Sequence, residues 1–242
     1  MVSSARERVA ATLRAAALGA AGLLALQVWG VLLASVAVGV VGPLDVTART
    51  VVGTAALGLG TATVAGAYLR LSERDASYVD FRRPTRRDLA YVVAGVVALL
   101  AVLVVLDRVT AALGVTPAQH SIEREARGGH AGVLLVLVPL SVLVVGPGEE
   151  LLYRNVVQKS LTETFPRWRA IGIASAIFAL VHVFAYSTGN STASLATTLG
   201  IIFVLAVVLG VLYARTENTL VPALVHGTYN AVQFALLYGQ LR

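Results

Sequence analysis

The sequence predicts an all-α, polytopic membrane helix bundle, and three observations support this fold class. The 242 residues are 57% hydrophobic and only 13% charged, whereas soluble domains usually have about 25% charged residues. The mean hydropathy is +0.79. Most of the arginines flank long apolar runs, as is typical of helices that end at lipid headgroups. We therefore expect residues 1–242 to form one transmembrane domain of a multi-pass protein in the cell membrane.

Apolar runs and helix-breaking residues predict about eight helices in this domain. Gly146-Pro147-Gly148 is expected to end the fourth helix and to begin the fifth. The first apolar run is too long for the core of a signal peptide and is interpreted as a retained helix. The expected helices cover residues 10–41, 50–71, 86–113, 131–145, 149–165, 168–186, 194–213 and 220–238.

The positions of the arginines predict the orientation of the chain. Arg6, Arg8 and Arg14 place the N-terminus on the cytoplasmic side, and the arginine-rich segment 72–88 returns there after two crossings. If the polar fifth helix lies at the membrane interface, the chain crosses seven times and ends outside. If it crosses as an eighth span, the C-terminus is cytoplasmic and the charges of that helix line a cavity that opens toward the cytoplasm. Charge favours seven crossings.

Composition also limits the partners and cofactors. The net charge of +6 is explained by orientation in the membrane and by anionic headgroups, and no long polar domain exists that could bind nucleic acid. The expected partners are the lipid bilayer and a membrane-associated protein or peptide. The absence of cysteine excludes disulfides, thiolate nucleophiles and cysteine–zinc sites.

Glu149 and Glu150 are the first candidate site residues, because carboxylates at membrane depth are costly and therefore suggest function. In the first turn of a helix, unpaired N–H groups would stabilise the anion, while apolar surroundings would favour the neutral acid. Such opposed effects suit a general base. Arg154 lies four residues after Glu150 and can pair with it on one helix face.

His182, His226 and Asn230 are the other candidates, each on an apolar helix. His226 and Asn230 are four residues apart and share one face, where their N–H groups could bind a developing oxyanion. Alone, each residue is also explained as a polar contact within a helix bundle. Two further histidines, His120 and His130, are interpreted as ordinary solvated loop residues.

Three motifs together resemble a known family. Glu149-Glu150-x-x-x-Arg154, Phe178-x-x-x-His182 and His226-x-x-x-Asn230 are similar to the motifs of the type II CAAX prenyl endopeptidase and bacteriocin-processing (CPBP, or Abi) intramembrane proteases. The resemblance covers residues 141–236 and favours eight helices. The sequence departs from the family pattern at Asn155, where a glycine commonly follows the arginine.

The resemblance implies roles for the matching residues. Glu149 would be the general base, with His182 as its partner in activating water, and His226 and Asn230 would form the oxyanion hole. Glu150 and Arg154 would support them. The expected activity is hydrolysis of peptide bonds in membrane-associated substrates; the family includes proteases for prenylated CAAX-type proteins, but nothing in this sequence shows prenylation.

The resemblance leaves the role of a metal open, since the family is often labelled as metalloproteases. Glu149, His182 and His226 could supply the three protein ligands of a catalytic zinc site. The sequence has no His-Glu-x-x-His motif, and the two histidines lie on separate helices. We expect no cofactor, with zinc as the alternative.

Two other functions compete with a protease. A non-catalytic membrane scaffold or immunity-type factor could retain the fold and bind a partner. A transporter could use Glu149 and the histidines as a proton relay, although no internal repeat of the kind found in many transporters is visible. The complete set of motif residues favours catalysis, because a scaffold does not need all of them within the lipid.

Overall fold

The computed structural model describes residues 4–242, and these residues form helices with no strand. Six helices are long and apolar enough to cross a membrane. They are α1 (Ala5–Val41), α2 (Val46–Leu71), α3 (Arg86–Ala112), the continuous helix Gly132–Thr162, α10 (Thr192–Thr216) and α11 (Leu220–Gln240). A shorter pass consists of α8 (Arg167–Val181) and α9 (Val183–Tyr186). The prediction of an all-α multi-pass membrane bundle is confirmed.

The predicted helix break at Gly146-Pro147-Gly148 is wrong. Residues 132–162 form one helix made of α5 (Gly132–Leu140), a π-helical turn η3 (Ser141–Val145), α6 (Gly146–Glu150), a π-helical stretch η4 (Leu151–Gln158) and α7 (Lys159–Thr162). A proline inside a helix lacks an N–H group and collides with the preceding turn, and π-helical turns are one way to relieve this conflict. The expected fourth and fifth helices are therefore a single pass, and Glu149 and Glu150 lie in the middle of it instead of in a first turn.

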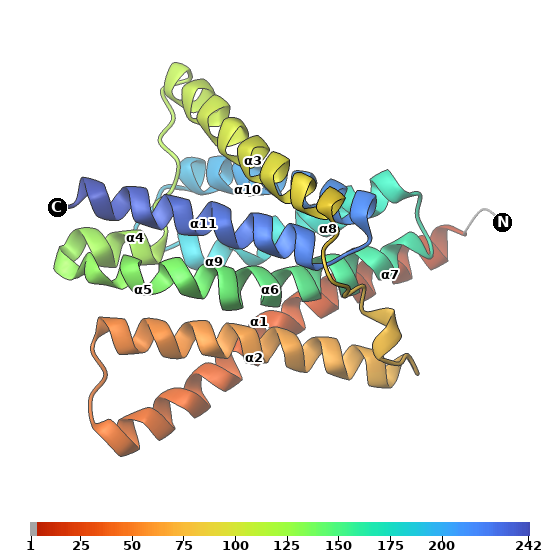
Figure 1. Cartoon of the computed structure of the whole chain (residues 1–242), viewed down its shortest axis with the longest axis horizontal. Helices are drawn as coiled ribbons and strands as arrows, with labels where there is room; N and C mark the ends of the chain where they lie inside the picture. Colours follow the sequence, from red (N-terminus) through yellow and green to blue (C-terminus); the bar gives the residue numbers. More distant parts are fainter. Residues whose placement is uncertain (1–3) are drawn as a thin grey trace.

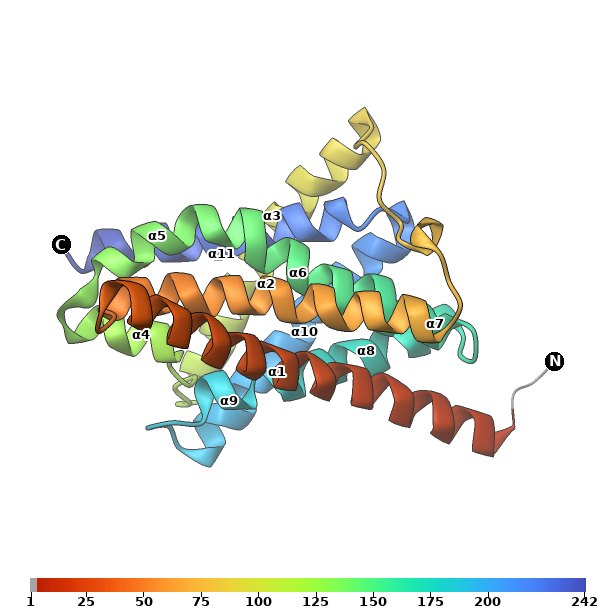
Figure 2. The same cartoon turned by 90° about the horizontal axis from the view of Figure 1, so that it is seen from below.

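The passes alternate in direction, so that the start of α1 and the end of α11 lie at opposite ends of the bundle (Figures 1 and 2). The end that contains the start of α1, residues 72–85 and the loops after α7 and α10 is called the arginine-rich end. The other end, called the mouth end, contains residues 42–45, residues 113–131 with α4 (Ser121–Glu125) and η2 (Ala126–His130), residues 187–191 and the end of α11. With α8 and α9 added to the six long helices, the number of passes equals the smaller predicted count, but for a different reason: residues 149–162 continue the fourth pass instead of lying at the interface.

Polar contacts hold the segments of the arginine-rich end together. Asn155 is fully buried, and its Oδ1 accepts hydrogen bonds from the Asp80 amide (2.8 Å) and the Thr219 hydroxyl (3.2 Å). The Lys159 ammonium donates to Asp80 at 2.7 Å, and the Tyr213 hydroxyl donates to the same carboxylate at 2.5 Å. The asparagine that departs from the family pattern thus joins residues 72–85 to the helices on either side.

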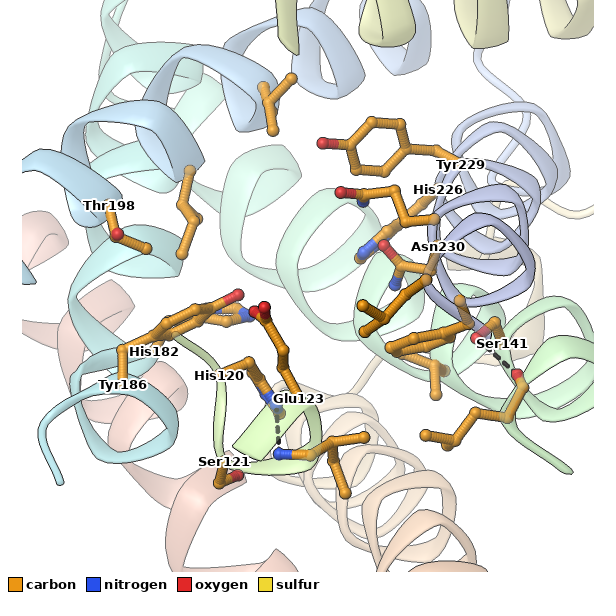
Figure 3. Close-up of a pocket in the computed structure, with 18 of the residues that line it drawn as sticks. His120, Ser121, Glu123, Ser141, His182, Tyr186, Thr198, His226, Tyr229 and Asn230 are labelled. Atoms are coloured by element: carbon orange, nitrogen blue, oxygen red, sulfur yellow. Dashed lines mark hydrogen bonds between the residues drawn. The ribbon is translucent and has the colours of Figure 1, made fainter. Parts of the chain in front are cut away.

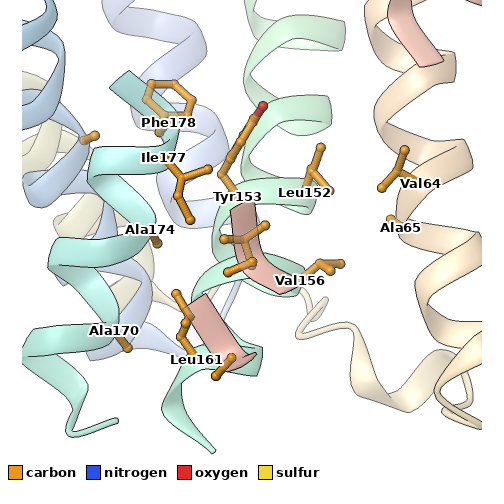
Figure 4. Packing of buried hydrophobic residues seen from close by; sticks show 14 residues of the cluster. Val64, Ala65, Leu152, Tyr153, Val156, Leu161, Ala170, Ala174, Ile177 and Phe178 are labelled. Carbon is orange, nitrogen blue, oxygen red and sulfur yellow. The ribbon is translucent and has the colours of Figure 1, made fainter. Parts of the chain in front are cut away.

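Apolar packing fixes the pass that carries the two glutamates. Leu152 and Val156 are fully buried and pack with Tyr153, Ala174 and Ile177 in one cluster (Figure 4). This cluster lies between α1, α2 and α8. It gives the central helix apolar neighbours on several sides and positions the residues that follow the Gly-Pro-Gly sequence.

The central helix touches α11 through backbone atoms. A Cβ atom added to Gly146 would collide with the Ala223 carbonyl oxygen, and one added to Gly227 would lie 2.6 Å from the Ser141 carbonyl oxygen. Only glycine permits so close an approach of two helices. His226 directly precedes Gly227, and Glu150 follows Gly146 by one helical turn, so this contact helps to set their separation.

Candidate active site

A cavity of about 1360 Å³ lies between the helices and contains the predicted site residues. Glu149, His182, His226 and Asn230 all line it. Figure 3 shows His226 and Asn230 on the wall formed by α11, facing His182 on the opposite wall. The structure therefore brings residues from three separate passes to one cavity.

Glu150, Arg154 and His226 form a buried chain of interactions behind this cavity. The Arg154 Nε donates to Glu150 Oε2 at 2.8 Å, and both side chains are completely buried. The other carboxylate oxygen of Glu150 lies 2.9 Å from His226 Nδ1. Because an ionised carboxylate can only accept hydrogen bonds, Nδ1 carries the proton. The predicted pairing of Glu150 with Arg154 is present.

Glu149 lies on the cavity side of His226. Its Oε2 is 3.8 Å from His226 Nε2, and its side chain is 12% exposed. Each of the two glutamates thus faces a different nitrogen of one imidazole. When Glu149 is ionised and His226 is an imidazolium, the two carboxylates, the guanidinium and the imidazolium have no net charge, which lowers the cost of placing them within the lipid.

Phe178 and His182 occupy the opposite wall. His182 ends α8, and its Nδ1 lies 2.7 Å from the Phe178 carbonyl oxygen. A carbonyl oxygen only accepts, so His182 donates from Nδ1 and its Nε2 is the acceptor nitrogen. The Phe178 ring contacts His182 and His226 (centroid distances of 4.5 and 5.9 Å) and lies 5.1 Å from the Arg154 guanidinium carbon. Phe178 therefore connects the two walls, a function that its position in the motif alone did not reveal.

The buried chain leaves two polar atoms of Arg154 without a partner. Its Nη1 and Nη2 atoms are buried and have no hydrogen bond among residues 4–242, although the Phe178 ring covers the guanidinium. A ring face attracts such a cation by about 0.5–2 kcal/mol. Arg154 is thus held by one carboxylate and one aromatic ring.

His120 lines the same cavity, whereas the sequence was interpreted as placing it in a loop as an ordinary solvated residue. It packs edge-on against Tyr186 at a centroid distance of 4.9 Å, and Figure 3 shows it on the same side of the pocket as His182. Burial, then the nearby His182 and Arg124, lower the pKa of His120 to about 4. Its Nδ1 accepts the Ile122 amide proton at 3.0 Å and caps α4. No sequence signal indicated this, since residues 113–131 have no strong periodicity. The structure leaves His130 exposed.

The donor set for a zinc ion is not assembled. In the part of the chain that the structure describes, no three His, Asp or Glu side chains are grouped closely enough to hold a metal. His182 and His226 both pack on the Phe178 ring, at centroid distances of 4.5 and 5.9 Å, and the two do not group together with Glu149. The arrangement of Glu149, His182 and His226 does not fit a zinc site.

Comparison with known proteins finds a family that matches part of this chain. Residues 131–232 match the family described as type II CAAX prenyl endopeptidase, Rce1-like. No curated protein and no solved structure matches the chain. The matched segment contains every candidate residue from Glu149 to Asn230 and begins where the central helix begins. This part of the chain is an Rce1-like domain of the type II CAAX prenyl endopeptidase (CPBP) family.

Proposed function

We propose that the protein is an intramembrane endopeptidase that hydrolyses peptide bonds of membrane-associated polypeptides with water activated by Glu149. The observation that carries this proposal is the arrangement around His226, with Glu150 at Nδ1 and Glu149 near Nε2. A fixed imidazole beside a partly exposed carboxylate at a cavity wall provides both a base and a donor. The family of residues 131–232 supports the same reaction class.

In the proposed reaction, Glu149 accepts a proton from a water molecule as the water attacks the substrate carbonyl carbon. The carbonyl oxygen gains negative charge and accepts hydrogen bonds from the imidazolium Nε2–H of His226 and from the Asn230 amide, both on one face of α11. Glu150 and Arg154 keep His226 in place. His182 orients the water through its acceptor nitrogen, and Glu149 then gives its proton to the leaving amine.

Glu149→Gln tests this mechanism, because glutamine keeps the shape of the side chain and loses the basic oxygen. We expect turnover to fall by about 10²–10⁴-fold while the protein remains folded in the membrane. Membrane peptides that accumulate in cells with the wild-type protein and with the variant can be compared by mass spectrometry. Glu217→Gln is the matched control, since Glu217 is 74% exposed at the arginine-rich end.

Two results would contradict the protease proposal. If the peptides that depend on the wild-type protein are still formed at an undiminished rate by Glu149→Gln, Glu149 is not the base. If no peptide depends on the protein at all, the non-catalytic scaffold becomes the better explanation.

A chelator tests whether the reaction requires a metal ion. If Glu149 and the histidines activate water alone, strong chelators leave the activity of the purified protein unchanged. A required zinc ion would instead make the activity sensitive to the chelator and restorable by zinc. Zinc bound stoichiometrically and lost together with activity would overturn the metal-free mechanism.

A further inference from the structure

We infer that the cavity opens on the side of the membrane opposite the cytoplasm, and that its substrate is an extended tail of a membrane-anchored polypeptide presented on that side. The inference names the substrate class of the proposed protease and therefore rests on the proposed function. It depends on three separate features: the distribution of cationic side chains, the position of the opening and the depth of Glu149 and His226 below it.

The first feature is charge. Of the 19 lysine and arginine residues, Arg154 is buried at the site, and five are at the mouth end: Arg49, Arg108, Arg124, Arg127 and Arg242. All the others lie at the arginine-rich end. The connecting loops are short, which is the condition under which lysine and arginine determine orientation. The arginine-rich end is therefore cytoplasmic, and the mouth end is on the other side.

The second feature is the opening. The cavity lining includes the exposed residues Asp107, Glu125, Arg127 and Gln240, all at the mouth end. No residue of the segments that define the arginine-rich end lines the cavity. The contacts of Asn155, Lys159 and Tyr213 with Asp80 join those segments to one another. We therefore place the opening on the side away from the cytoplasm, whereas the eight-span alternative expects a cavity that opens toward it.

The rim of the opening is ordered. The Ala118 amide donates to the Thr198 hydroxyl at 2.7 Å, and Gln119 exchanges backbone hydrogen bonds with the Asn190 side chain at 3.0 and 3.1 Å. These contacts join residues 113–131 to the start of α10 and to residues 187–191. The rim also places Glu123 and His120 against the cavity, so an incoming chain meets polar side chains before it reaches Glu149.

The third feature is depth. His226 lies 14 residues before Gln240 on α11, which corresponds to roughly 21 Å at about 1.5 Å per residue. An extended peptide advances about 3.4 Å per residue. A substrate therefore needs roughly six unfolded residues between the rim and the bond that is cut. A folded surface loop cannot supply this reach, whereas a flexible tail next to a membrane anchor can.

This orientation distinguishes the inferred substrate from the prenylated C-terminus that the family name suggests. A prenylated C-terminus held at the cytoplasmic leaflet would face the arginine-rich end, which contributes no residue to the cavity lining. A polypeptide anchored with its tail on the opposite side would meet the rim directly. The first requirement on the substrate is then the side of the membrane on which its tail lies, and not prenylation.

Orientation can be measured without any substrate, because the chain contains no cysteine. Gly128→Cys places a single thiol at the mouth end, where an added Cβ meets no atom within 4 Å. Ala76→Cys places one at an exposed position of the arginine-rich end. We expect a membrane-impermeant maleimide to label Gly128→Cys at least tenfold faster than Ala76→Cys in intact cells, and both to be labelled after permeabilisation.

The reverse labelling, or equal labelling in intact cells, would overturn the inference. If either thiol fails to react after permeabilisation, alkaline phosphatase fused after Arg242 gives the answer, because it is active only outside the cytoplasm. An active fusion is expected, and an inactive but stable fusion contradicts the orientation. Neither measurement needs catalysis, so a failed orientation is distinguished from failed catalysis, which Glu149→Gln reports.

Substrate reach has its own test once a cleaved membrane peptide is known from the comparison with Glu149→Gln. Shortening the tail between its anchor and the cut bond to three residues should reduce cleavage by at least tenfold, and lengthening the tail should not. Equal cleavage of the shortened tail would remove the requirement for an extended segment. This result would not affect the orientation, which thiol labelling tests, or the mechanism, which Glu149→Gln tests.

Discussion

Two ion pairs in this chain have the same residues and the same spacing but different surroundings. Glu150 and Arg154 lie 2.8 Å apart and are completely buried, whereas Glu123 and Arg127 lie 2.9 Å apart at the mouth end with side chains 28% and 43% exposed. Both are four residues apart along a helix. The first pair is held by α11 and Phe178, and the second has water on one side. The spacing makes both pairs possible, and the degree of burial determines how much each pair contributes to stability.

The largest expected difference comes from removing the two arginines. Arg154→Ala leaves the Glu150 carboxylate buried without its cation, which typically costs about 3–5 kcal/mol of stability. Arg127→Ala removes an exposed pair worth about 0.3–0.5 kcal/mol. Thermal denaturation of the purified proteins in detergent should therefore show a large loss for the first variant and almost none for the second.

Similar small losses for both variants would show that water reaches Glu150 and that the pair is not isolated. A large loss for Arg127→Ala would instead mean that the rim supports the whole bundle. Either result would remove the distinction between the two pairs.

A second, smaller difference concerns two glycines. Gly227→Ala, at the contact of α11 with the central helix, places a Cβ 2.6 Å from the Ser141 carbonyl oxygen and 2.7 Å from the Val142 Cα. Backbone atoms cannot move aside easily, so we expect a loss of about 1–3 kcal/mol. Gly132→Ala, at the exposed first residue of the central helix, meets no atom within 4 Å and should change the stability by less than about 0.5 kcal/mol.

The same denaturation experiment measures both glycine variants. Activity separates them further, because Gly227→Ala should also displace His226 from Glu150. A Gly227→Ala protein with normal stability and normal turnover would show that the two helices do not need their close contact.

The smallest effect is expected at the rim and depends on pH. The pKa of His120 is lowered to about 4, mainly by burial and also by His182 and Arg124, below the ordinary value of about 6.5. The docked rim is thus fully stable above pH 6.5 and loses stability as the pH falls toward 4, because the unfolded segment binds the proton more readily. Protonation of Nδ1 also removes the acceptor for the Ile122 amide.

Hydrogen exchange of residues 115–130, corrected for its intrinsic pH dependence, measures this effect. Protection should decrease several-fold between pH 7 and pH 5 in the wild-type protein. His120→Asn keeps a residue that can cap α4 but does not titrate, so its protection should not change over this range. The same decrease in His120→Asn would assign the effect to another group.

The fold class and the pairing of Glu150 with Arg154 could be predicted because they depend on local patterns. Apolar runs define passes through lipid, and residues four apart meet on one face of a helix. The Gly146-Pro147-Gly148 sequence was misleading for a physical reason. Helix propensity disfavours a helix there, but close packing against Gly227 and the π-helical turn before the proline stabilise one.

The positions of His120 and Phe178 could not be predicted, because both depend on contacts between distant segments. His120 reaches the cavity only because residues 117–119 dock on Thr198 and Asn190, about 70–80 residues later. Phe178 connects His182, His226 and Arg154 only after α8 and α11 are placed. Sequence reasoning identified the residues that match motifs, but not which imidazole would lie next to Glu149.

The glycine contact between the central helix and α11 also has a mechanical consequence. Two rods that touch at one point can pivot there, whereas two rods in contact along their length move as one body. From Gly146 and Gly227 the contact continues to the mouth end, where Val133 and Leu134 pack with Phe234 and Leu237. The wall that carries Glu150 and His226 is therefore one stiff unit from the site to the rim, and the carboxylate and the imidazole keep their separation when a chain enters.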